Sequence, residues 1–126
     1  MPTLPWTVPN TPPPHIDVHV FASRFETRTL WGALRFLLRT PGVWRQVSRA
    51  PGAYGAALKA EPLRRTFWTL SAWESEKALG EFARTGPHGP TARGLAAQMR
   101  GAEFAGWTAK SEDLPVDWTE VRRRLS

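Results

Sequence analysis

The chain contains no cysteine, and this absence excludes disulfide bonds, thiolate metal sites and a cysteine nucleophile. Histidine is scarce as well, with 3 residues in 126, so a zinc site is disfavoured. No apolar run approaches the roughly 20 residues that a membrane-spanning helix needs. The N-terminus has no basic segment followed by an apolar one, so no signal peptide is predicted and a cytoplasmic protein is expected.

Acidic residues are outnumbered by basic ones, 11 to 17, and the formal net charge is +6. Such a charge attracts nucleic acids and other anions, but a general preference for arginine produces it too. The basic residues are scattered, apart from Arg64-Arg65 and the run Arg122–Arg124. No strand alternates them with aromatic residues as an RNA-binding sheet does. We therefore expect no nucleic-acid partner and no membrane partner.

Proline sets the N-terminal segment apart, because six prolines fall within residues 1–14. A segment so rich in proline neither continues a helix nor forms a central strand, so residues 1–14 are predicted to be an extended arm. A chain of this length forms one domain, which we place at residues 15–110. Residues 111–126 are predicted to be a tail with a short helix that begins at Asp117.

A strict alternation of residue types predicts the first strand of this domain. Val18 and Val20 point to one face, whereas His19 and Ser23 point to the other. The same period of two recurs before Trp73. The predicted strands are residues 16–24, 54–60, 65–73 and 104–110.

Apolar residues spaced three or four apart predict helices between these strands. One is predicted over residues 29–38, and Thr40-Pro41-Gly42 is expected to interrupt it before the apolar face continues. A second helix begins after Ser75, an N-cap residue, and ends at Gly86 before a proline. A further helix is predicted over residues 91–100.

The resulting order is β-α-β-β-α-β, the arrangement of a ferredoxin-like α+β fold. We predict a four-stranded antiparallel sheet with helices on one face. The other face carries Val18, Val20, Trp68 and Leu70, and an uncovered apolar face of this kind requires a partner. The prediction is therefore a homodimer in which two sheets pack face to face, a dimeric α+β barrel.

The segment from residue 67 to residue 88 predicts a small cavity between the sheet and its helices. Trp73 either stacks on a flat ligand or serves as a core aromatic residue. His88 is a candidate general base or haem ligand, and otherwise a turn residue that caps the next helix. Hydroxyl and aromatic side chains share one face of the strand. The predicted cavity residues are Ser23, Phe67, Thr69, Ser71, Trp73 and His88.

Two more residues are candidates for substrate binding. His19 is a hydrogen-bonded pocket wall, or the base in place of His88. Arg93 holds an anionic group such as a propionate or an enolate, and an exposed arginine in water is the alternative. Cofactor-free oxygenation needs a base that forms a substrate carbanion and a dry pocket that holds dioxygen. His88 or His19, together with Trp73 and Ser71, meets these needs.

The stretch FWTLSAWES, followed by an Ala-Leu-x-x-Phe helix, resembles the dimeric α+β barrel superfamily. The similarity is to its antibiotic-biosynthesis-monooxygenase-like and spheroidene-monooxygenase-like members in particular. WGALRFLLRTPGVWRQVSRAPG fits the same group, and the resemblance covers residues 16–110. Members include cofactor-free oxygenases of polyketide anthrones, haem-degrading enzymes and haem-containing carotenoid oxygenases.

By this resemblance, Trp73 matches the tryptophan that lines the pocket in haem-degrading members. Ser23-Arg24 stands where those members have Asn-Arg, so a hydroxyl replaces an amide. Their haem-ligand histidine lies on the second main helix, which has none here, and the nearest imidazole belongs to His88. The resemblance implies a monooxygenase-like enzyme that acts on a hydrophobic conjugated molecule, cofactor-free or haem-dependent. The alternative is a non-catalytic dimeric barrel that binds a small apolar ligand or haem.

Overall fold

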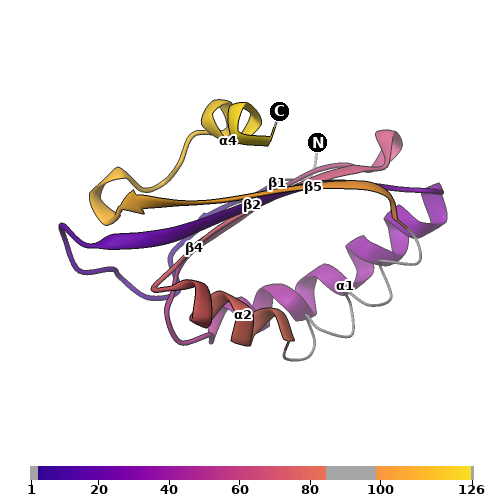
Figure 1. The fold of residues 1–126 in the computed structure, drawn as a ribbon. Helices are drawn as coiled ribbons and strands as arrows, with labels where there is room; N and C mark the ends of the chain where they lie inside the picture. The colour runs from indigo at the N-terminus through magenta and orange to yellow at the C-terminus, as the bar shows by residue number, and fades with distance from the viewer. Residues whose placement is uncertain (1–2, 85–98, 126) are drawn as a thin grey trace.

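A twisted antiparallel sheet lies between two helical layers in the computed structural model, which describes residues 3–84 and 99–125 (Figure 1). Helices α1 and α2 lie on one side of the sheet, and α4 lies on the other. No helix in the described part of the chain is long and apolar enough to cross a membrane. The elements are β1 (Thr3–Thr7), β2 (Asp17–Thr27), α1 (Leu30–Ser48), β3 (Ala53–Glu61), a 3₁₀ turn (Pro62–Arg64), β4 (Thr66–Trp73), α2 (Glu76–Arg84), β5 (Met99–Lys110), a second 3₁₀ turn (Ser111–Asp113) and α4 (Trp118–Leu125).

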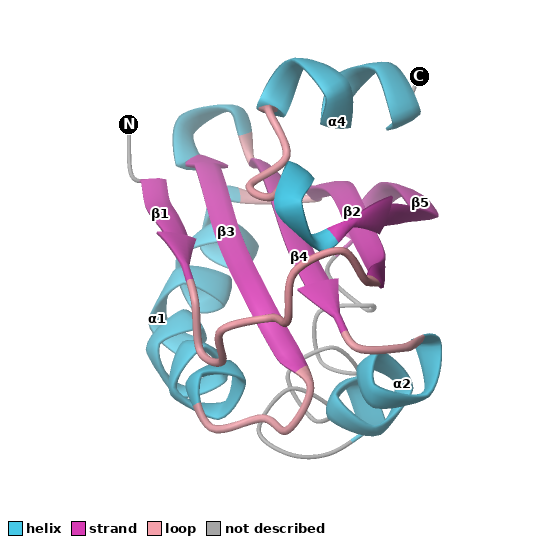
Figure 2. Ribbon diagram, turned by 90° about the vertical axis from the view of Figure 1, so that its left-hand side faces the viewer, coloured by secondary structure: helices cyan, strands magenta, loops and turns pink. Residues whose placement is uncertain are grey.

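The strand order is β1-β3-β4-β2-β5, and every neighbouring pair is antiparallel (Figure 2). The register places His19 of β2 opposite Trp73 of β4 and opposite Thr108 of β5. The predicted α+β, ferredoxin-like fold class is confirmed. The sheet has five strands, whereas the sequence predicted four, because a strand from the proline-rich segment joins its edge.

Strand β1 pairs with β3, so part of the predicted arm belongs to the sheet. Proline is tolerated here because β1 is an edge strand, whose outward N–H groups have no ladder partner to lose. The Trp6 indole lies over Gly55 of β3, where a Cβ atom would come within 1.8 Å of Trp6 Cζ2. Because Gly55 has no side chain, the Trp6 indole can pack directly on β3, and this contact helps to hold β1 against the sheet.

Replacing Gly55 with alanine should lower the free energy of unfolding by about 1–3 kcal/mol, because the new methyl group displaces the Trp6 indole. Urea denaturation measures this change. Gly101→Ala is the matched control, since a Cβ there meets no atom within 4 Å. The loss should largely disappear in a Trp6→Ala background. An equal loss in that background would show that the indole is not the cause.

Helix α1 runs without a break from Leu30 to Ser48, so the predicted interruption at Thr40-Pro41-Gly42 is wrong. Proline removes one backbone hydrogen bond of a helix, but tertiary packing of the flanking turns can compensate for that loss. Ala33 before the proline and Val47 after it are both buried against the sheet. The Thr40 hydroxyl also donates a hydrogen bond to the Phe36 carbonyl, at 2.9 Å.

Hydroxyl side chains cap α2 at Ser75, as the sequence predicted, and α1 at Thr29, which the sequence placed inside its helix. Thr29 Oγ1 accepts a hydrogen bond from the Gly32 N–H, and Ser75 Oγ accepts one from the Ala78 N–H. Strand β5 begins at Met99, so residues 99–100 are strand and not the end of a helix. The remainder of the helix predicted over residues 91–100 lies outside the described residues.

Helix α4 covers the sheet face that the sequence left uncovered, and the prediction of helices on one face alone is wrong. Asp117 begins the helix as expected, with its Oδ1 accepting a hydrogen bond from the Thr119 N–H. Val121 is fully buried and Leu125 is 8% exposed. The surface proposed for dimerisation is thus largely occupied within the chain. The residues that pack with these two are Val18, Val20, Ala22, Ala57, Leu70 and Ala72.

Candidate functional site

Two separate hydrophobic clusters lie on the side of the sheet that faces α1 and α2. The first surrounds Phe67, which is fully buried and stacks on Phe25 with ring centroids 5.3 Å apart. The second surrounds Trp73, which is 1% exposed and packs on Phe82 of α2 at 5.0 Å. Each cluster belongs to one end of β4, so the middle of the strand lies between them.

A row of small hydroxyl side chains fills this middle part. Ser23 of β2 lies opposite Thr69 of β4, and their hydroxyl oxygens are 2.5 Å apart. Ser71 follows on the same face, opposite Phe21. Ser23 is buried and the other two are half-buried. A polar strip between two apolar clusters is the arrangement that orients a ligand in a mostly apolar pocket.

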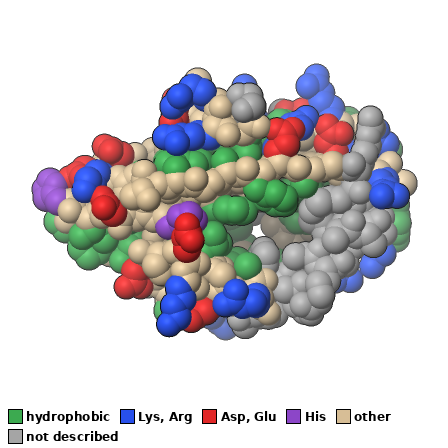
Figure 3. All heavy atoms as spheres, in the orientation of Figure 1, with side chains coloured by type: hydrophobic (Ala, Val, Ile, Leu, Met, Phe, Trp, Pro, Cys, Tyr) green, Lys and Arg blue, Asp and Glu red, His purple; other side chains and the backbone are tan. Residues whose placement is uncertain are grey.

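The strip lies beside the outer strand β5, where Phe104 pairs with Ser23. Phe104 of β5 is 61% exposed, and its ring stacks on Phe21 with centroids 6.0 Å apart. Figure 3 shows a hollow between the sheet and the helical layer, with hydrophobic side chains above it. An exposed aromatic pair beside a polar strip is a surface on which a flat, conjugated molecule can stack.

Trp73 carries the clearest sign of an unfilled interaction. Its Nε1 is the one buried side-chain nitrogen or oxygen without a hydrogen-bond partner in the part of the chain that the structure describes. A buried donor left unsatisfied costs about 1–3 kcal/mol, and native structures avoid this cost unless the group has another role. An acceptor oxygen of a ligand would remove it.

His19 is the imidazole that the described residues place on the helix-facing side. Its side chain is 14% exposed, and its Nδ1 lies 3.9 Å from the Glu76 carboxylate at the start of α2. The ring lies over Gly106 of β5, where a Cβ atom would come within 3.2 Å of His19 Cε1. Glycine at this position therefore leaves space for the imidazole beside the strip.

The predicted site residues thus fall into three groups. Ser23, Thr69 and Ser71 form the hydroxyl strip, while Phe67 and Trp73 are buried on either side of it. His19 lies opposite Trp73 at one end. His88 and Arg93 lie outside the described residues. Within the described ranges, no group of three or more histidine, cysteine, aspartate or glutamate residues is placed to hold a metal ion.

Sequence reasoning did not select Phe104, Gly106 or Glu76 as parts of the site. Phe104 and Gly106 alternate on β5 with the same period of two that identified the other strands. Which residues of β2 lie opposite them depends on the register of the two strands, and a local sequence pattern does not determine that register. Glu76 was detectable as an acidic residue in the first turn of a helix whose N-cap the sequence had identified.

This arrangement provides three chemical capacities in one place. The imidazole of His19 lies with its Nδ1 3.9 Å from the Glu76 carboxylate, and an imidazole is a common general acid or base in enzymes. The hydroxyls of the strip and the buried Trp73 N–H are hydrogen-bond donors, the kind of group that stabilises a developing oxyanion in enzymes. The two clusters give the strip apolar flanks. Proton abstraction from a conjugated, hydrophobic molecule uses all three.

An antiparallel sheet with this topology defines a ferredoxin-like α+β protein, and its helix-facing side carries a strip of hydroxyl side chains. No family model matches the sequence, and the search of curated proteins found no match either. Solved structures do match in fold, and they include proteins described as monooxygenases of antibiotic biosynthesis, the group that the sequence resembles.

Three of these structures illustrate the match. SnoaB, a cofactor-independent oxygenase from Streptomyces nogalater, is 20% identical with a TM-score of 0.59, and the alignment covers 80% of this chain and 100% of that one. A structure described as an antibiotic biosynthesis monooxygenase is 14% identical with a TM-score of 0.59, and the alignment covers 74% of this chain and 96% of that one. A conserved protein from Methanosarcina mazei is 13% identical with a TM-score of 0.61, and the alignment covers 74% of this chain and 92% of that one. At such identities the likeness concerns the fold.

Proposed function

We propose that the protein is a cofactor-free monooxygenase that acts on a hydrophobic, conjugated small molecule at the hydroxyl strip. The observation that carries the proposal is the unsatisfied, buried Nε1 of Trp73, on the same face as Ser71 and opposite His19. The described activity of SnoaB, a cofactor-independent oxygenase of the same fold, supports it.

The proposed reaction begins at a methylene carbon that a neighbouring carbonyl makes acidic. His19 takes a proton from this carbon, and hydrogen bonds from Trp73 or Thr69 stabilise the resulting enolate oxygen. The carbanion reacts with dioxygen to give a peroxide. Loss of water then leaves a carbonyl at the former methylene carbon, so one oxygen atom enters the product and the other leaves as water. No external reductant is required.

Haem is the alternative cofactor, and it would require an axial imidazole. In the described part of the chain the imidazole on the helix-facing side is that of His19, which lies near the Glu76 carboxylate. This pair suits proton transfer, and we therefore favour the cofactor-free form. The absorption spectrum of the protein with added haem separates the two forms, since a Soret band that disappears in His88→Ala would favour haem.

Replacing His19 with alanine should lower the rate of dioxygen consumption with dithranol, a hydroxylated anthrone, by about 100-fold or more. Gly106→Ala should cause a smaller loss of about tenfold, because the new methyl group displaces the imidazole without removing it. Gly101→Ala, on the same strand, should leave the rate unchanged. Dioxygen uptake by an oxygen electrode measures all four proteins. A wild-type protein that binds dithranol without consuming dioxygen would instead support the non-catalytic ligand-binding barrel.

A homodimer belongs to the same proposal. Val121 and Leu125 occupy the sheet face within the chain, so two sheets meet only when α4 leaves that face. Sedimentation of the full chain at micromolar concentration measures the assembly, and a monomer would contradict the homodimer without affecting the proposed chemistry.

A further inference from the structure

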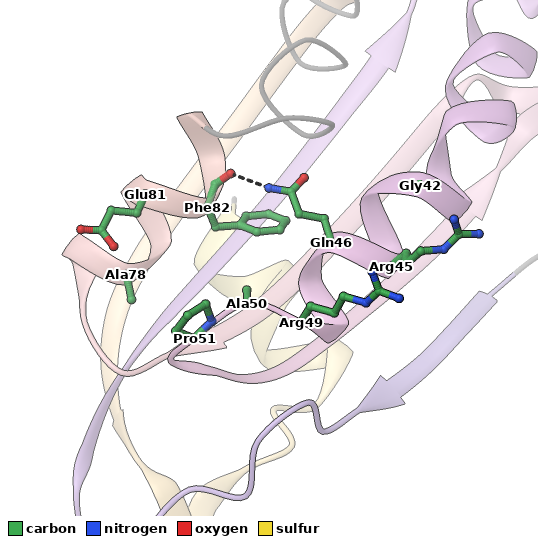
Figure 4. A pocket seen from close by; sticks show the side chains of 9 residues that line it. All are labelled: Gly42, Arg45, Gln46, Arg49, Ala50, Pro51, Ala78, Glu81 and Phe82. Carbon is green, nitrogen blue, oxygen red and sulfur yellow. Dashed lines mark hydrogen bonds between the residues drawn. The ribbon is translucent and has the colours of Figure 1, made fainter.

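A second concave site lies away from the hydroxyl strip, between the C-terminal half of α1 and helix α2 (Figure 4). Its volume is about 560 Å³, within the range of small-molecule sites in proteins. One wall comes from α1 and the turn after it, and the other from α2. The lining residues are Gly42, Arg45, Gln46, Arg49, Ala50, Pro51, Ala78, Glu81 and Phe82.

Two arginines give this pocket its charge. Arg45 lies in the last turn of α1 and Arg49 is the C-cap residue that follows it, four residues later, so their side chains are neighbours at the end of the helix and both are exposed. Neither arginine forms an ion pair with a carboxylate in the described ranges. Two positive charges at this spacing repel each other, and no ion pair within those ranges offsets that repulsion. Glu81 extends from α2 away from the two arginines (Figure 4). An anion bound between the guanidinium groups would relieve the repulsion.

The back of the pocket is apolar and fixed in place. The half-buried Phe82 ring packs on the Trp73 ring, with ring centroids 5.0 Å apart. The small side chains of Ala50 and Ala78 leave space beside the Phe82 ring. Gln46 Nε2 donates a hydrogen bond to the Phe82 carbonyl, at 3.2 Å, and so joins the two walls (Figure 4). The pocket therefore exists before a ligand binds, which lowers the entropic cost of binding.

We propose that this pocket binds an amphiphilic anion, namely a flat apolar body that carries one carboxylate. The anionic group lies against Arg45 and Arg49, where planar guanidinium groups bind a carboxylate through paired hydrogen bonds. The apolar body lies against Phe82 and the two alanines. The site is independent of the proposed oxygenation, since no residue of the hydroxyl strip lines it.

Calorimetric titration with naphthoate tests the proposal on the full chain. Naphthoate should bind the wild-type protein, and the double variant Arg45→Gln/Arg49→Gln should bind it at least tenfold more weakly. The matched control is Arg35→Gln/Arg39→Gln, which removes two exposed arginines of α1 that have the same spacing and lie outside the pocket. This control should bind as the wild type does. All four arginines are exposed, so thermal unfolding should confirm that both variants keep the fold.

Two further ligands separate the parts of the proposed recognition. Naphthylmethanol, the neutral counterpart, should bind at least tenfold more weakly than naphthoate, and inorganic phosphate should bind weakly because it lacks an apolar body. Equal losses in the two double variants would show general charge attraction and overturn the site. Unchanged binding in Arg45→Gln/Arg49→Gln, no binding of naphthoate, or phosphate binding as tight as that of naphthoate would also overturn it.

Discussion

Replacing Trp73 with alanine is expected to lower the free energy of unfolding by about 3–5 kcal/mol, the range for a large aromatic residue removed from a packed core. Trp73 is 1% exposed, and its ring packs on Phe82 at 5.0 Å. The buried neighbours of Trp73 are small side chains, which cannot extend far enough to fill the space. Urea denaturation measures the loss. The small neighbours are Ala50, Ala53 and Ala56, together with Val47.

Trp73→Phe separates the packing role from the proposed ligand role. Phenylalanine removes the unsatisfied Nε1 donor and leaves a modest gap, so the two effects offset and stability should change by less than about 1.5 kcal/mol. Turnover of dithranol should nevertheless fall by about tenfold, because the hydrogen bond to the developing oxyanion is lost. Trp44→Phe, in the same cluster but half-buried, is the control and should retain turnover. Full turnover in Trp73→Phe would make Trp73 a core residue alone.

Replacing Val121 with aspartate should detach α4 from the sheet and lower the free energy of unfolding by about 3 kcal/mol or more. Val121 is fully buried on an apolar face, where an unpaired carboxylate is strongly disfavoured. The face beneath α4 then becomes exposed, including Val20 and Leu70. An exposed apolar face of this kind promotes self-association, so the variant should sediment as a larger species than the wild type.

The matched control for this change is Thr119→Asp, which adds the same charge to the same helix at an exposed position. It should leave stability within about 0.5 kcal/mol and leave the assembly state unchanged. If Val121→Asp kept wild-type stability and sedimentation, α4 would contribute nothing to covering the sheet. The face would then be available to a second copy of the chain, as the sequence predicted.

The parts of the fold that local patterns determine were predictable from the sequence. Alternation in β2 and β4 identified which residues share the helix-facing side, and Ser75 identified the start of α2. Pro41 misled the prediction, because the packing of Ala33 and Val47 on the sheet outweighs the local cost of a proline. Helix propensity is a property of the segment alone, whereas the burial of its side chains depends on which other elements of the fold pack against it.

The covered face and the site illustrate the same distinction. Val121 and Leu125 are one helical turn apart, a pattern too short to indicate that an arginine-rich tail packs on the sheet. The hydrogen bond between Ser23 and Thr69 requires the register of two strands that α1 and β3 separate along the chain. His88 and Arg93 stay predictions. The α1–α2 pocket was missed because its two walls are distant in sequence, although the spacing of Arg45 and Arg49 was visible.

The position of β1 bears on how copies of this chain avoid adding strands to one another. A sheet edge with free backbone N–H and C=O groups can recruit another chain's strand and begin aggregation. β1 is 5 residues long, includes Pro5 and continues into the proline-rich stretch, so that edge accepts a new strand poorly. The opposite edge is β5, with 12 residues, and in the described part of the chain no strand pairs with its outer side. Unwanted strand addition, where it occurs, should therefore begin at β5.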